Sequence, residues 1–191
     1  MFSKALLIVS LLVASLLALT HHLKPITPAD YAAGLGKGFD VTWSEFGKYR
    51  QNYTSDVPQH FADAGFTNVR IRMNEQHPDK NFFDSLKEQV EHCLNNNIYP
   101  ILAYQGHELE ENLQATDEQN KAILVNWWSE MARQFHDYDY KLSFNLLVEI
   151  SGRYKNDYKK MNEFYKAVIK AVRDIDPYRI IIVPPVKLSD P

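Results

Sequence analysis

Two kinds of apolar pattern alternate along the chain. Short apolar runs of the length and composition of β-strands occupy five segments, which are Gly36–Trp43, Thr67–Met73, residues 98–106, the segment Lys141–Gly152 and Arg179–Pro185. Between them, apolar residues recur at helical spacing and predict helices near residues Asp56–Ala64, Asn81–Asn96, Thr116–Phe135 and Asn156–Ile175. Strands that alternate with helices predict parallel βαβ units, so the expected class is α/β.

Two α/β architectures compete for this pattern, an open doubly wound sheet and a closed eightfold barrel. A nucleotide-binding open sheet carries a glycine-rich turn after an early strand, whereas GLGKG at residues 34–38 precedes its strand. The barrel is therefore favoured. A complete barrel takes about 250 residues, and this chain supplies five strands. We expect a (β/α)8 TIM barrel truncated to about its first five strands.

The segment Lys141–Gly152 places one carboxylate at the end of an otherwise apolar strand. Side chains of a strand alternate between its two faces, and one face of this segment is wholly apolar. The other face has polar residues at its ends and consists of Ser143, Asn145, Leu147 and Glu149. The second face suits a barrel interior, and Glu149 falls at the carboxyl end of the strand, where α/β barrels carry catalytic groups. A structural alternative is that Glu149 only caps the strand or pairs with Arg153.

Other polar residues stand at the same ends of the remaining strands. They are Asp40 and Trp43, then Arg70, Arg72 and Asn74, then Tyr104, Gln105 and His107, and finally Lys187. Two arginines on one strand face need acidic partners. In a barrel all these residues converge on one rim, and a carboxyl group, an arginine, a histidine and aromatic rings together suit the cleavage of glycosidic bonds.

Composition excludes several other classes of function. The chain is 45% hydrophobic and 24% charged, which is typical of one globular domain, and a net charge of −3 without a basic cluster argues against a nucleic-acid partner. Cys93 is the single cysteine, expected inside a helix rather than as a reactive thiol. Seven histidines show no metal-binding spacing, so we expect no metal and no cofactor.

Residues 1–20 read as a targeting segment. Lys4 precedes an apolar run from Ala5 to Leu19 that is shorter than the ~20 residues of a membrane-spanning helix. We therefore expect an exported protein, secreted or periplasmic, with a membrane anchor through residues 5–19 as the alternative and no other membrane contact. Residues 21–35 are predicted as a linker and residues 36–191 as the partial barrel.

Three of these segments resemble glycoside hydrolase family 5, the cellulase-type barrels. GFTNVRIRM is similar to the second-strand motif, in which the arginine at the position of Arg70 lies beneath the nucleophile. YQGH stands where the family has its histidine, which matches His107. FNLLVEI is similar to the fourth-strand motif that ends in Asn-Glu-Pro, which makes Glu149 the proton donor. The resemblance covers about Gly36 to Pro191 and implies a retaining glycosidase that acts on a β-glycan.

Departures from the family pattern leave two functions open. Val148 and Ile150 replace the asparagine and the proline of the fourth-strand motif, and the family's nucleophilic glutamate lies on a seventh strand. Glu45 and Glu108 are expected to be solvated loop residues, and Trp43 and Tyr104 are the candidates for stacking on sugars. The alternative function is an exported half-barrel that binds glycan, or a remnant, without catalysis.

Overall fold

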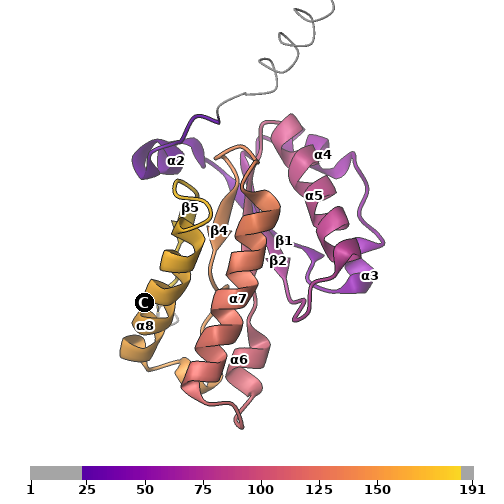
Figure 1. The fold of residues 1–191 in the computed structure, drawn as a ribbon. Helices are drawn as coiled ribbons and strands as arrows, with labels where there is room; N and C mark the ends of the chain where they lie inside the picture. The colour runs from indigo at the N-terminus through magenta and orange to yellow at the C-terminus, as the bar shows by residue number, and fades with distance from the viewer. Residues whose placement is uncertain (1–22, 186–191) are drawn as a thin grey trace, which may run out of the picture.

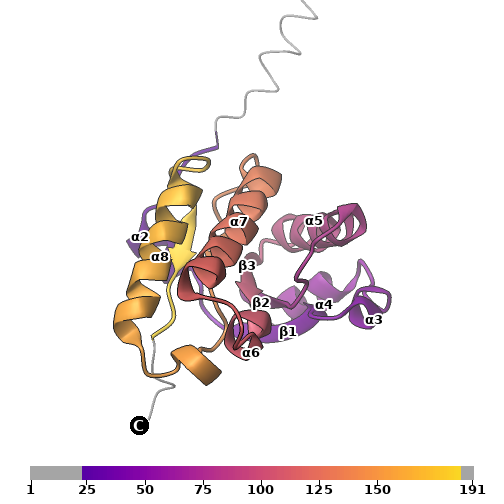
Figure 2. The same cartoon turned by 60° about the horizontal axis from the view of Figure 1, so that its bottom comes forward.

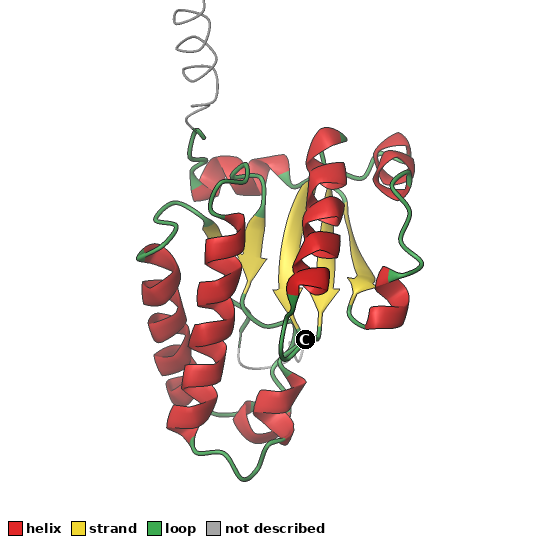
Figure 3. Ribbon diagram, turned by 45° about the vertical axis from the view of Figure 1, so that its right-hand side comes forward, coloured by secondary structure: helices red, strands yellow, loops and turns green. Residues whose placement is uncertain are grey.

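The structure is a computed structural model that describes residues 23–185. Five strands form one parallel sheet in chain order. Figure 3 shows the sheet in yellow and the helices around it in red. The strands are β1 (Gly38–Ser44), β2 (Asn68–Met73), β3 (Tyr99–Tyr104), β4 (Ser143–Asn145) and β5 (Ile180–Ile182). Consecutive parallel strands with helical crossovers are the arrangement of an α/β barrel wall, so the predicted class is confirmed.

Three long helices pack on the outer face of this sheet (Figures 1 and 2), and shorter helices surround it. The long helices are α5 (Lys80–Asn95), α7 (Asp117–Phe135) and α8 (Tyr158–Arg173). The shorter elements are α2 (Pro28–Gly34), α3 (Gly47–Arg50), α4 (Val57–Asp63), α6 (His107–Glu111) and the 3-10 turn η1 (Gly152–Tyr154).

The main apolar core lies between the sheet and the helices. On β2, Val69, Ile71 and Met73 are fully buried on this side, whereas Arg70 and Arg72 alternate onto the opposite side. The same alternation holds on β4, where Phe144 faces the helices and Asn145 the other side. Arginine side chains are thereby kept on the side that forms the interior of a closed barrel.

Helix α2 corrects the prediction that residues 21–35 form a linker. Pro28 occupies its first turn, and the side chain of Thr27 accepts a hydrogen bond from the backbone N–H of Asp30, which caps the helix. Tyr31 is buried, donates a hydrogen bond to Ser143 Oγ at 2.6 Å and packs edge-on against Tyr99 at 5.5 Å. The helix therefore covers the amino-terminal end of the sheet interior.

Most predicted elements agree with the structure. The four predicted helices are present with ends shifted by up to two residues, and the capping box of Thr116 and Gln119 is formed. Strands β4 and β5 are shorter than predicted, and α3, α6 and η1 were not predicted. Residues 1–20 lie outside the described residues. Within residues 23–185, no helix is long and apolar enough to cross a membrane.

Candidate active site at the strand ends

Arg70 and Asp40 form an ion pair on the interior side of the sheet. They are direct neighbours in the register of β1 and β2, and Arg70 donates from Nε to Oδ1 at 3.1 Å and from Nη2 to Oδ2 at 2.7 Å. Each side chain is about one-third exposed, Arg70 at 34% and Asp40 at 38%. This two-point contact fixes the orientation of the guanidinium and keeps a positive charge at the open face.

A second polar group lies beside this pair. Arg72 approaches Glu45 Oε1 at 3.5 Å and Asp40 Oδ2 at 3.9 Å, while Gln105 donates from Nε2 to Glu45 Oε1 at 3.0 Å. The two arginines thus have acidic partners, as predicted. Glu45 was expected to be solvated, and that prediction is wrong because its side chain is only 12% exposed.

Glu149 follows β4 with its carboxylate exposed. Its neighbours Val148 and Ile150 are 7% and 3% exposed, and the N–H of Val148 donates to the carbonyl of Tyr104 at 2.8 Å. The backbone on either side of the exposed Glu149 is therefore held by two buried side chains and by this hydrogen bond. Within residues 23–185, the Glu149 carboxylate has no hydrogen bond or ion pair, and Arg153 binds Asp117 at 2.6 Å instead.

His107 is placed by a left-handed glycine. Gly106 ends the connection from β3 with φ of +69°, and a side chain there would meet Leu147 Cδ2 at 2.5 Å, so glycine is needed for both conformation and space. His107 then begins α6 and is exposed. His107 and Glu149 therefore follow the carboxyl ends of the adjacent strands β3 and β4. Arg70 was expected at the end of its strand, but it lies in the middle of β2, level with Ser143 at the start of β4.

Trp43 and Tyr104 do not occupy the interior side. Trp43 packs on the helix side against Tyr53 and Phe61, with ring centroids 5.1 and 5.8 Å away. Tyr104 is fully buried and stacks on Trp127 at 4.1 Å. The structure thus contradicts the prediction that these rings stack on sugars, because strand alternation turns both toward the helices.

The Tyr104 hydroxyl donates to Glu108 Oε1 at 2.7 Å. Burial raises the pKa of Tyr104 above its ordinary range, and the neighbouring Glu108 carboxylate raises it further. The tyrosine therefore stays neutral and keeps its hydrogen bond. Glu108 was expected to be solvated, and this contact with a buried hydroxyl corrects that expectation.

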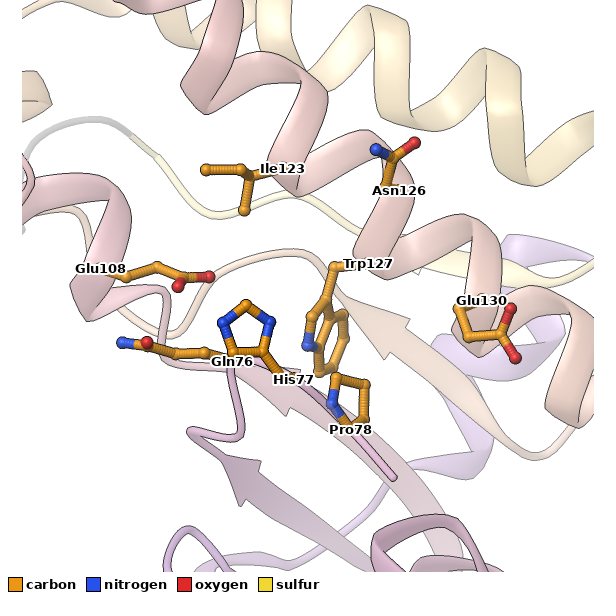
Figure 4. A pocket seen from close by; sticks show the side chains of 8 residues that line it. All are labelled: Gln76, His77, Pro78, Glu108, Ile123, Asn126, Trp127 and Glu130. Atoms are coloured by element: carbon orange, nitrogen blue, oxygen red, sulfur yellow. The ribbon is translucent and has the colours of Figure 1, made fainter. Parts of the chain in front are cut away.

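A cavity of about 410 Å³ lies between the segment after β2, α6 and α7 (Figure 4). It is lined by Gln76, His77, Pro78, Glu108, Ile123, Asn126, Trp127 and Glu130. Trp127 donates from Nε1 to the carbonyl of Glu75 at 2.8 Å, which anchors the segment after β2 to α7. Arg70 and Glu149 do not line this cavity.

Cys93 and the possible metal ligands are the remaining groups of chemical interest. Cys93 is buried inside α5, as predicted, and burial raises its pKa to about 12. In the described part of the chain, no group of three or more His, Cys, Asp or Glu side chains could hold a metal ion.

Comparison with known protein families identifies the family of the chain. The model of the cellulase family, glycosyl hydrolase family 5, matches residues 32–190. The chain belongs to glycosyl hydrolase family 5. The matched region includes all five strands and the residues Arg70, His107 and Glu149. A comparison with curated proteins gave no match.

Solved structures of family 5 enzymes share the fold. A family 5 enzyme from Prevotella bryantii B14 superposes with a TM-score of 0.72 and 20% identity over 84% of this chain and 57% of its own. Cel5A of Thermotoga maritima in complex with cellobiose gives 0.72 and 22% over 82% and 54%. A hyperthermophilic endo-beta-1,4-glucanase in complex with substrate gives 0.70 and 27% over 83% and 54%. The chain thus spans about half the length of these TIM-barrel enzymes.

Proposed function

We propose that the family 5 chain forms part of a glycosidase active site in which Glu149 is the general acid and then the general base. The observation that carries the proposal is the exposed, unpaired carboxylate of Glu149 among the described residues, held between buried neighbours at the end of β4. Carboxyl ends of barrel strands carry the catalytic groups of this fold. His107, at the end of the adjacent β3, is proposed to bind substrate.

The proposed reaction is retaining hydrolysis of a glycosidic bond. Glu149 gives its proton to the leaving oxygen while a second carboxylate, about 5 Å away, attacks the sugar carbon. Water then cleaves the covalent intermediate with Glu149 as the base. Arg70, whose guanidinium is oriented by two hydrogen bonds to Asp40, is proposed to supply positive charge to a nearby carboxylate. The family pattern places the second carboxylate on a seventh strand, which is not among the five described.

A β-glycan is the proposed substrate. Related solved structures are described in complex with cellobiose, mannotriose and a xyloglucan tetradecasaccharide. All three are oligosaccharides, and the exposed rim of this chain offers hydrogen-bonding side chains of the kind that bind hydroxyl groups. The choice among glucan, mannan and xyloglucan is tested by comparing turnover of the three polymers.

Substitution of Glu149 by Gln in the full-length protein tests the assignment. The amide keeps the size of the side chain but cannot give up a proton as an acid, so hydrolysis of β-1,4-glucan oligosaccharides is expected to fall at least a thousandfold. Glu88→Gln is the matched control, because Glu88 is exposed on α5, and it should retain wild-type turnover. Near-normal hydrolysis by Glu149→Gln would refute the assignment.

The alternative function is glycan binding without catalysis. The observation in its favour is the buried Val148, which stands where the family pattern has an asparagine beside the catalytic glutamate. A wild-type protein that binds β-glucan but releases no reducing sugar would support this alternative. Measurable turnover that requires Glu149 would exclude it.

Export through residues 1–20 is proposed together with this function, because polymeric glycans are degraded outside the cytoplasm. Sequencing of the amino terminus of the protein recovered from its native host tests it. A new terminus near residue 20 indicates cleavage, whereas an intact terminus in the membrane fraction indicates the anchor through residues 5–19.

A further inference from the structure

A second cavity adjoins the one shown in Figure 4. It has a volume of about 510 Å³ and shares two lining residues with the first cavity, Ile123 and Asn126. The rest of its lining comes from the segment after α6 and from the first half of α7, with Asn112, Gln114, Ala115, Gln119 and Ala122. The two cavities together form the α7 groove, and each has the volume of a small-molecule site, about 300–1,000 Å³.

Several side chains of the α7 groove carry hydrogen-bonding groups that the described protein does not use. Gln76, His77 and Asn126 are exposed, and within residues 23–185 their side chains form no hydrogen bond or ion pair. Glu108 accepts the hydrogen bond from Tyr104 with Oε1, whereas its Oε2 has no partner among these residues and is not enclosed. These groups line one cavity from three elements, which suits a ligand with many hydroxyl groups.

Apolar side chains form the rest of this cavity. Ile123 and Pro78 are partly exposed in its lining, and the buried ring of Trp127 lies beside them. The Trp127 indole is fixed by its stacking on Tyr104 at 4.1 Å and by the hydrogen bond from Nε1 to Glu75 at 2.8 Å. A rigid apolar lining with polar groups around it matches a sugar, whose C–H groups are apolar and whose hydroxyls are polar.

The charge of the α7 groove argues against an ionic ligand. No lysine or arginine is among the described residues that line the two cavities, so a phosphate or a carboxylate finds no cation there. Of the two carboxylates in the lining, Glu130 is already paired with Arg133 at 2.9 Å, so a cationic ligand finds only Glu108. Neutral amide side chains predominate, and an amide both donates to and accepts from hydroxyl groups.

We propose that the α7 groove is a second glycan-binding site that holds uncharged sugar units of the substrate polymer. The choice of ligand rests on the proposed function, because hydrolysis brings the same polymer to this end of the sheet. Glu108 directly follows His107 on α6, so the groove begins one residue from the histidine proposed to bind substrate. Two sites that bind one polymer raise its local concentration at each of them, so long chains are expected to bind more tightly than short ones.

The indole N–H of Trp127 reports directly on the α7 groove. The full-length Glu149→Gln protein with isotope-labelled tryptophan is titrated with cellohexaose and followed by NMR. We expect the Trp127 Nε1–H signal to shift and to reach saturation, because the ring lines the groove and its N–H is held by Glu75. The double variant His77→Ala with Asn126→Ala should bind about tenfold more weakly by this signal, as expected for the loss of two hydrogen bonds.

Asn162→Ala is the matched control for this titration. Asn162 is an exposed asparagine on the neighbouring helix α8, and its replacement should leave the affinity unchanged. A Trp127 signal that cellohexaose does not move, or an unchanged affinity in the double variant, overturns the inference. A signal that moves with oligolysine but not with cellohexaose also overturns it, in favour of a cationic peptide.

Turnover by the wild-type protein separates this inference from the proposed function. Hydrolysis of β-1,4-glucan without a shift of the Trp127 signal overturns the second site and leaves the proposed function intact. A saturable shift of the Trp127 signal in a protein whose wild type hydrolyses no β-glycan overturns the proposed function alone.

Discussion

Arg179 is a fully buried cation whose removal should destabilise the protein strongly. It precedes β5, is 0% exposed and pairs with Asp176 at 2.8 Å, whose side chain is 1% exposed. The remaining four N–H groups of the guanidinium donate at 2.8–3.1 Å to the carbonyl oxygens of Phe135, Tyr138, Asp139 and Leu142. All five donors are thus used, and one side chain joins the end of α7, the approach to β4 and the start of β5.

The magnitude follows from what Arg179→Met leaves behind. Removal of one partner of a buried ion pair costs about 3–5 kcal/mol, because the other charge stays buried and uncompensated. Four carbonyls also lose their donor, and some of them regain water. The free energy of unfolding of a whole domain is about 5–15 kcal/mol, so a loss of about 3–5 kcal/mol is a large part of it. This loss is expected to lower the midpoint of urea unfolding by about one to several molar.

Urea unfolding followed by tryptophan fluorescence measures this change. Arg133→Met, an exposed arginine, is the control and should change the free energy of unfolding by less than 1 kcal/mol. The double variant Arg179→Met with Asp176→Leu should be more stable than Arg179→Met alone, because no buried carboxylate remains. A cost below 1 kcal/mol for Arg179→Met would refute the reasoning.

Two further predictions concern the ends of elements. Thr116→Ala removes one half of the capping box of α7 and should cost about 1 kcal/mol in urea unfolding, whereas an equal free energy in both proteins would contradict the role of the cap. Burial raises the pKa of Tyr31 to about 12 from its ordinary value of 10.0, so the unfolded chain loses its proton first as pH rises. The neutral Tyr31 therefore stabilises the fold below pH 10, and this contribution to the free energy of unfolding falls by up to about 3 kcal/mol between pH 10 and 12. The Tyr31→Phe protein should lose less stability over this pH range than the wild type. An equal decrease of the free energy of unfolding in both proteins would contradict the prediction.

The fold could largely be predicted from periodicity. Helical stripes and the capping residues of α7 define the long helices, because a helix is specified by contacts close in sequence. Helix α2 was missed since seven residues with one buried side chain, Tyr31, carry no periodic signal. Its stability depends on contacts with Ser143 and Tyr99, which are distant in sequence.

The candidate site could be predicted only in part. Position at a strand end correctly placed Glu149, whereas Arg70 lies in the middle of β2. The choice of Asp40 as the partner of Arg70 depends on the register of β1 against β2, which alternation does not define. Trp43 and Tyr104 were assigned by closeness to the rim, although alternation along each strand turns them toward the helices. Arg72 was noticed as a neighbour of Arg70, and its unpaired Nε emerges only from three-dimensional contacts.

Helix α2 is the first described element and lies at the amino-terminal end of the sheet. Tyr31 joins this helix to the start of β4, whereas Glu149 follows the other end of that strand. Figure 1 shows α2 and α6 at opposite ends of the sheet. A proposed attachment through residues 5–19 would therefore join the described chain at the end of the sheet opposite to α6. Polymeric glycan could then approach the catalytic side from the surrounding medium without first passing between the protein and the membrane.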